Sequence, residues 1–117
     1  MSHDEHDKSI DYIEFPARHI ERVKRFYSAV FDWKFRDWGP EYTSFKDGRL
    51  TGGFRLSSDV GTSGPLVVIF AEDLESLAMA VERHGGQIVK EAFSFPGGRR
   101  FHFLDPSGNE LAVWSRT

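Results

Sequence analysis

The sequence contains no cysteine, which excludes disulfide bonds, thiol nucleophiles and thiolate metal ligands. It also lacks any apolar run that approaches the roughly 20 residues of a membrane-spanning helix. The first residues, MSHDEHDK, are polar and lack the hydrophobic stretch of a secretion signal. We therefore expect a cytoplasmic protein with no membrane partner.

Basic residues are not in excess, because 15 Lys and Arg stand against 18 Asp and Glu and the formal net charge is −3. The chain also has no long basic stripe, so nucleic acid is a poor candidate partner. Aromatic side chains are plentiful, with 11 Phe and 3 Trp, and they are large enough to fill a core or line a cavity. A length of 117 residues fits one domain.

The first half of the chain shows a strand, a helix and three further strands. Alternating apolar and polar residues predict a strand over 9–17, closed by Pro16. From Ile20 onward the apolar residues recur every three or four positions, which predicts an amphipathic helix. Turn-forming pairs then separate three short predicted strands, at 32–38, 41–47 and 52–57.

The second half repeats this order after a small, polar and glycine-rich linker at 59–65. A strand is predicted at 66–72, followed by a helix that Asp73 caps and Gly85-Gly86 ends. Three more strands are predicted at 87–93, 99–105 and 109–115.

The segment DPSGN before the last strand predicts a tight turn. Asp105 and Asn109 can bond nearby backbone groups, Pro106 fixes φ, and Gly108 permits a left-handed conformation. In the strand that follows, alternation places one set of residues on one face and the other set on the opposite face: Glu110, Ala112 and Trp114 against Leu111 and Val113.

Superposing the halves with an offset of 54 residues places Phe15 on Ile69 and Ile20 on Leu74. The chain therefore reads as a flexible leader over 1–8 and one domain over 9–117, built from two βαβββ repeats at about 9–58 and 66–117. Each repeat is too small to bury its own sheet, so the two must share a core. We predict an α+β fold whose curved mixed sheets form a cup.

Four stretches occur in a characteristic order along the chain: IEFPARHIERVKRFYSAVFDWKF, TGGF, the Gly85-Gly86 pair and DPSGNELAVW. With them the chain resembles the vicinal oxygen chelate superfamily, which includes glyoxalase I, the bleomycin-resistance proteins and the extradiol dioxygenases. It is most similar to small bacterial single-domain proteins related to lactoylglutathione lyase. The resemblance implies a glyoxalase-like domain over 9–117 and a homodimer, for which the aromatic stretch at 31–38 is the expected contact.

The resemblance also implies where a divalent metal would be held, since enzymes of the superfamily commonly bind one through His, Gln or Glu. The equivalent positions fall on Tyr12, Leu66 and Ala112, with the fourth near Gly52, Gly53 or Phe54. None of these is a usual ligand, so we predict no metal and no other cofactor. The alternative is a displaced metal site formed by Glu14, His102 and Glu110.

Without a metal, the candidate functional site is a concave aromatic pocket with a few polar groups. The candidate ligand-binding residues are Tyr12, Trp33, Phe45, Phe54, Arg100, Phe103 and Trp114. Further aromatic side chains that could line the pocket are Trp38, Tyr42 and Phe95. The alternative is that half or more of these rings fill the core beneath the sheets. Arg100 is either a solvated charge or a contact for an anionic ligand.

Two functions follow from this pattern, and a third, weaker alternative is a degenerate domain whose role is only interaction with a partner. The first is binding of a small aromatic or oxygenated molecule in the cup, as in the bleomycin-resistance proteins. The second is a lyase, isomerase or dioxygenase, with lactoylglutathione-lyase-like or dioxygenase-like activity, that uses a non-standard metal or an acid–base pair such as Glu14 and His102. The sequence does not decide whether the protein is an enzyme, and its candidate catalytic residues are Glu14, His102 and Glu110.

Overall fold

The computed structural model describes residues 8, 10, 12–61 and 64–117. The leader expected at 1–8 lies outside these residues except for Lys8. The elements are β1 (Tyr12–Ala17), α1 (Ile20–Phe31), β2 (Lys34–Asp37), β3 (Tyr42–Lys46), β4 (Thr51–Leu56), β5 (Val67–Phe70), α2 (Leu74–Arg83), β6 (Gln87–Phe95), β7 (Gly98–Leu104) and β8 (Glu110–Ser115). None of the described helices is long and apolar enough to cross a membrane.

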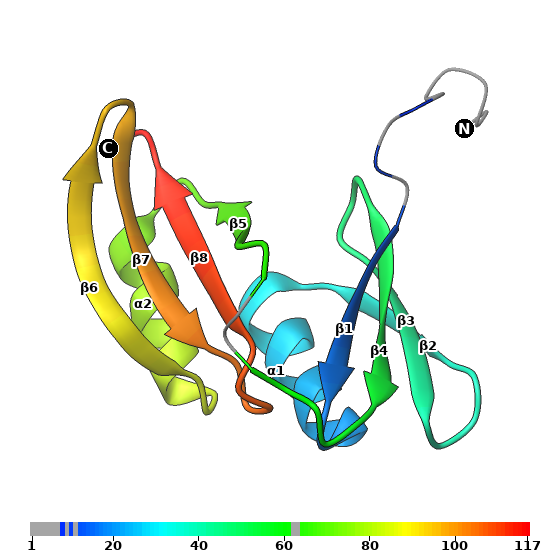
Figure 1. The fold of residues 1–117 in the computed structure, drawn as a ribbon. Coiled ribbons are helices and arrows are strands. Elements are labelled where there is room, and N and C mark those ends of the chain that lie inside the picture. The colour runs from blue at the N-terminus through cyan, green and yellow to red at the C-terminus, as the bar shows by residue number, and fades with distance from the viewer. Residues whose placement is uncertain (1–7, 9, 11, 62–63) are drawn as a thin grey trace.

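The described strands form two four-stranded sheets (Figure 1), the first ordered β1-β4-β3-β2 and the second β5-β8-β7-β6. In each sheet the strand before the helix pairs in parallel with the last strand, and the other neighbours are antiparallel. Helix α1 begins at Ile20 and α2 at Leu74, which is the offset that the internal repeat predicted. The predicted α+β fold of two βαβββ repeats is confirmed.

Strand β6 is longer than the sequence predicted, because it continues to Phe95 rather than ending at Phe93. The two residues Pro96 and Gly97 close a hairpin there, with Gly97 at a φ of 116° that favours glycine. Phe95 consequently pairs with Gly98 at the start of β7. The extra length of strand carries a second aromatic ring onto the same sheet face as Phe93.

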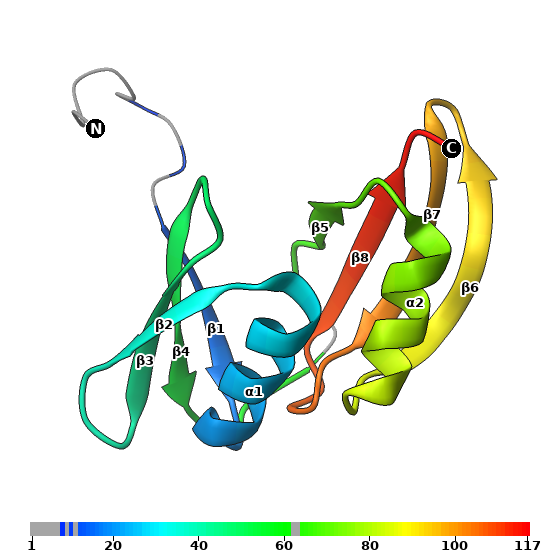
Figure 2. The same ribbon diagram turned by 180° about the vertical axis from the view of Figure 1, so that it is seen from behind.

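Both helices pack on the same side of the sheets and stand in front of the strands in Figure 2. Between helices and sheets lies one buried cluster that draws on both halves of the chain. Phe103 of β7 joins the halves, since its ring centroid is 5.9 Å from that of Phe26 and 6.0 Å from that of Phe31, both in α1. We call the face of each sheet that points away from the helices its open face.

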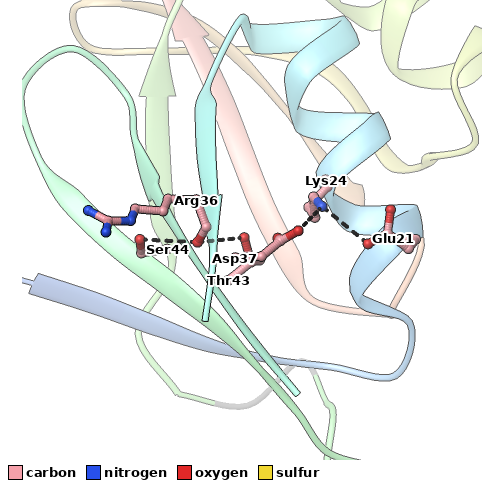
Figure 3. A network of polar contacts seen from close by, with 6 residues as sticks. All are labelled: Glu21, Lys24, Arg36, Asp37, Thr43 and Ser44. Carbon is pink, nitrogen blue, oxygen red and sulfur yellow. Dashed lines mark hydrogen bonds and ion pairs between the residues drawn. The ribbon is translucent and has the colours of Figure 1, made fainter. Parts of the chain in front are cut away.

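A polar network holds α1 against β2, the edge strand of the first sheet (Figure 3). The Lys24 ammonium lies 3.1 Å from a Glu21 carboxylate oxygen and 2.8 Å from one of Asp37. The hydrogen bond from Lys24 lowers the pKa of Asp37, which stays ionised. Thr43 donates its hydroxyl proton to the Arg36 carbonyl at 3.2 Å, which ties β3 to β2.

The DPSGN segment forms the tight turn that the sequence predicted between β7 and β8. Asp105 is buried, and one of its carboxylate oxygens accepts the backbone N–H groups of Ser107 at 2.9 Å and Asn109 at 3.0 Å. Gly108 takes a φ of 100°, which favours glycine. Burial raises the pKa of Asp105, although its hydrogen bonds act in the opposite direction.

The same turn joins the two repeats. The Tyr27 hydroxyl of α1 donates to the other Asp105 oxygen at 3.0 Å, and the Asn109 side-chain amide donates to the Pro16 carbonyl of β1 at 2.8 Å. Burial, ahead of the nearby Asp105 charge, raises the pKa of Tyr27, so its phenol keeps the proton that it donates. A turn near the end of the chain thus fixes β1 and α1 from the other half.

Candidate functional site

The open face of the first sheet carries a polar cluster centred on Glu14. The Tyr12 and Tyr42 phenol oxygens are 2.5 Å apart, and Tyr42 donates to one Glu14 oxygen at 2.9 Å. The other Glu14 oxygen lies 3.2 Å from Nε of Arg55. Burial, followed by the hydrogen bonds to Tyr12 and Glu14, raises the pKa of Tyr42. Gly53 makes room for the two phenols, because a Cβ there would meet both.

The open face of the second sheet carries a buried histidine with a carboxylate partner. His102 is 4% exposed, and its Nδ1 lies 2.9 Å from a Glu110 oxygen. With the proton on Nδ1, the ring donates to Glu110 and Nε2 is left as an acceptor. Nε2 has no partner in the described part of the chain.

Arg100 lies on the same strand and the same face as His102. Its Nε is also buried without a hydrogen-bond partner among the described residues. The guanidinium carbon is 5.3 Å from the Phe93 ring centroid and 5.5 Å from that of Phe95. The Phe93 ring in turn lies 5.8 Å from the His102 ring. Phe93 therefore stands next to both groups that lack a partner.

A pocket of about 230 Å³ opens beside Arg100 on the second sheet. Each of its four strands contributes one lining residue: Val68, Phe95, Arg100 and Trp114. The ring centroids of Phe95 and Trp114 are 6.2 Å apart. Pockets for drug-sized ligands begin at roughly 300 Å³, so this one suits a molecule with a single ring.

Strand register explains why these side chains meet. Arg100 pairs with Trp114 and His102 with Ala112, so all four face the same way. The sequence predicted that Glu110, Ala112 and Trp114 share a face while Leu111 and Val113 share the other. The structure confirms this, because Leu111 and Val113 belong to the buried cluster on the helix side.

A larger groove of about 430 Å³ lies on the helix side, away from both open faces. It is lined by Arg22, Arg25, Phe26, His84, Gly85 and Pro106. It brings together basic side chains of α1 and the end of α2, but no acidic partner or nucleophile among its lining residues. This groove therefore offers fewer kinds of functional group for catalysis or ligand recognition than the open face of the second sheet.

The structure divides the seven predicted ligand-binding residues into two groups. Four are core residues that pack beneath the sheets, each at most 6% exposed: Trp33, Phe45, Phe54 and Phe103. For these the core-filling alternative describes the placement, and they do not line the pocket. Arg100 and Trp114 do line it, whereas Tyr12 lies on the first sheet.

The predicted catalytic candidates are also divided. His102 and Glu110 are hydrogen-bonded to each other, but Glu14 lies in the other sheet and is bound by Tyr42 and Arg55. The structure therefore pairs His102 with Glu110 rather than with Glu14. The same division separates the three members of the displaced metal site.

The positions at which the resemblance implies metal ligands do not fit a divalent metal. The Tyr12 phenol is hydrogen-bonded to Tyr42, Leu66 has no donor atom, and Ala112 is a buried methyl group. In the part of the chain that the structure describes, no three His, Cys, Asp or Glu side chains lie together as a metal site requires.

Sequence reasoning missed three residues of these clusters: Phe93, Val68 and Arg55. The alternation in AFSF places Phe93 and Phe95 on the same face, which is a signal that could have found Phe93. Arg55 and Val68 depend on cross-strand register, because Arg55 pairs with Tyr42 and Val68 with Ala112.

Comparison with known proteins agrees with this architecture. The model of the Glyoxalase/Bleomycin resistance protein/Dioxygenase superfamily matches residues 9–113. A glyoxylase-like domain-containing protein of Didymella fabae is 28% identical over 121 residues, with 92% of this chain and 93% of that one covered.

Two solved structures show the same fold. A glyoxalase-related enzyme from Fulvimarina pelagi has a TM-score of 0.78 at 18% identity, covering 92% of this chain and 88% of its own. A genomically encoded fosfomycin resistance protein from Listeria monocytogenes has a TM-score of 0.80 at 11% identity, covering 94% of each chain. With a family match over nearly the whole sequence, the chain belongs to the glyoxalase/bleomycin resistance protein/dioxygenase superfamily.

Proposed function

We propose that the protein binds a small aromatic or oxygenated molecule in the pocket on the open face of the second sheet, without the metal site that the family resemblance implies. The observation that carries this proposal is the pocket itself. It combines the apolar walls of Val68, Phe95 and Trp114 with the single cation of Arg100. Apolar walls with one or two placed polar groups are typical of small-ligand sites.

Flat ligands suit this lining best. Phe95 and Trp114 stand at 62° to each other, so a ring that stacks on one meets the other edge-on. The Arg100 guanidinium supplies an attraction for a negatively charged or carbonyl oxygen at the edge of the ligand. The resistance protein from Listeria monocytogenes is named for a small molecule, and its likeness in fold supports a small-molecule role here.

The test compares affinities for a panel of single-ring aromatic compounds in the presence of EDTA. Trp114→Ala removes a pocket wall and should weaken binding about tenfold, which corresponds to about 1.4 kcal/mol. The matched control is Trp38→Ala, because Trp38 is exposed and lies at the end of β2 in the first repeat. If no compound binds, or if both variants bind as the wild type does, the proposal is wrong.

A second copy of the chain is the partner that we propose. Three exposed apolar residues lie at or next to β5, an edge strand of the second sheet: Leu66, Val68 and Phe70. The stretch at 31–38, which the sequence favoured as the contact, exposes only one of its four rings, Trp38. We therefore propose β5 as the homodimer contact. A cytoplasmic location fits the same proposal.

An acid–base enzyme is the second candidate, and the contact between His102 and Glu110 favours it. A carboxylate that holds Nδ1–H orients the imidazole for proton transfer at Nε2. Such a lyase or isomerase would show a bell-shaped pH profile, and Glu110→Gln would lower its rate. A turnover unchanged in His102→Gln would exclude this candidate.

A further inference from the structure

The second sheet places two buried polar atoms without a partner close together in sequence and on one face. They are Nε2 of His102 and Nε of Arg100, and neither has a partner among the described residues. Buried polar atoms are paired in the great majority of cases, because desolvation without a new hydrogen bond is unfavourable. One of the two is an acceptor and the other a donor, so a ligand that meets both must present a donor and an acceptor.

We propose that the ligand of this pocket is a weakly acidic hydroxy-aromatic compound, and that its hydroxyl transfers its proton to Nε2 of His102. This inference rests on the proposed function above and adds the chemical class of the ligand. The O–H bond of the ligand breaks and an N–H bond forms on the imidazole. The charge of the complex does not change, because the ligand becomes an oxyanion and His102 becomes a cation.

The neighbouring charges stabilise both products of this transfer. Glu110 on β8 holds the far side of the imidazole at 2.9 Å and stabilises the cation. Arg100 on β7 offers its unpartnered Nε to the oxyanion. On β6, Lys90 is the register partner of His102 and is exposed, so its positive charge is screened by water.

The Phe93 ring packs beside both groups. It lies 5.8 Å from the His102 ring and 5.3 Å from the Arg100 guanidinium carbon. The pairing of β6 with β7 is irregular on the N-terminal side of Phe93, where the register shifts between Lys90 and Phe93. Such irregularities bend a strand and re-aim the side chains beside them. We infer that the ligand reaches Nε2 by displacing the Phe93 ring.

The test uses two probes of the same shape, 4-nitrophenol and 4-nitroanisole, of which only the first has an acidic hydroxyl. Each is titrated with the wild-type protein at the lowest pH at which NMR still shows a neutral His102 in the ligand-free protein. The ionised fraction of bound nitrophenol is compared with that of free nitrophenol at the same pH. Absorbance reports the fraction of nitrophenolate, and imidazole NMR signals report the protonation of His102. We expect bound nitrophenol to be mostly ionised, His102 to move to the imidazolium position, and nitroanisole to bind at least about tenfold more weakly.

His102→Gln and Glu110→Gln are the matched variants. His102→Gln should still bind nitroanisole, which shows that the pocket is intact, while nitrophenol loses its ionisation and its advantage in affinity. Glu110→Gln should lower the ionised fraction, because the imidazolium loses its carboxylate.

The outcomes separate this inference from the proposed function. If neither probe binds, the proposed function fails and the inference fails with it. If both probes bind equally and nitrophenol stays protonated, the pocket is real but the inference is wrong. The inference is also wrong if nitrophenol ionises equally well in His102→Gln, because another group would then take the proton.

Discussion

Two adjacent glycines in β4 leave room for side chains of neighbouring strands, one glycine on each face of the first sheet. Gly52 points to the helix side, where an added Cβ would meet the Ile13 carbonyl and the Phe45 ring. Gly53 points to the open face, where an added Cβ would meet the phenol oxygens of Tyr12 and Tyr42. The obstacle is rigid backbone in the first case and the far ends of two side chains in the second.

We therefore expect the two alanine variants to differ in stability. Gly52→Ala should lower the free energy of unfolding by about 3 kcal/mol, because the backbone around Ile13 must move. Gly53→Ala should cost about 1 kcal/mol, since Tyr12 and Tyr42 can turn aside. Urea unfolding of both variants measures the difference. Equal losses would mean that the two positions are not packed as described.

At the same scale, the limits of sequence reasoning are clear from the aromatic residues. Alternation predicted which rings share a face, and the face shared by Ala112 and Trp114 is the observed one. Alternation does not say which face the helices cover, because that depends on how α1 and α2 dock. Phe45 and Phe54 were therefore as good candidates for the pocket as Trp114, although the structure buries both against the helices.

At the scale of elements, the sequence predicted most of the fold because its signals are local. Helix periodicity, turn residues and the repeat all act over a few positions, and each expected helix and strand is present. The contacts between elements were not predicted. Asp105 was recognised as a turn former, but its bond to Tyr27 spans 78 positions and no local pattern reports it.

This buried turn should contribute much to stability. Asp105→Ala leaves the Ser107 and Asn109 N–H groups and the Tyr27 hydroxyl without their acceptor, so we expect a loss of about 3 kcal/mol in the free energy of unfolding. Asp47→Ala is the matched control.

Asp47 also accepts two turn N–H groups, from Arg49 and Leu50, but it is exposed, so water can replace it. The decrease in the free energy of unfolding should be clearly smaller for Asp47→Ala than for Asp105→Ala in the same urea titrations. A control that costs as much as Asp105→Ala would contradict the role given to the buried turn.

At the scale of the whole molecule, the open faces differ in character. The first face is polar, and both carboxylate oxygens of its Glu14 are bound, by Tyr42 and Arg55. The second face has exposed apolar residues along β5 and two polar atoms without partners among the described residues. An exposed apolar edge strand is typical of an interaction surface. The second sheet is therefore where both ligand and partner are expected.

The homodimer proposal predicts a change in mass for a variant of β5. Phe70→Ser removes an exposed ring and should shift the protein toward monomer at micromolar concentration in light scattering. Met79→Ser is the control, because Met79 is also exposed and apolar but lies on α2. A wild-type protein that is already a stable monomer would contradict the proposal.

The most direct test of the account is a map of backbone amide NMR shifts on saturation with the tightest single-ring aromatic ligand, recorded in EDTA. We predict that the shifts concentrate around the pocket on the second sheet, at Val68, Phe95, Arg100 and Trp114. Shifts centred on the groove between Arg25 and His84, or binding that disappears in EDTA, would contradict it.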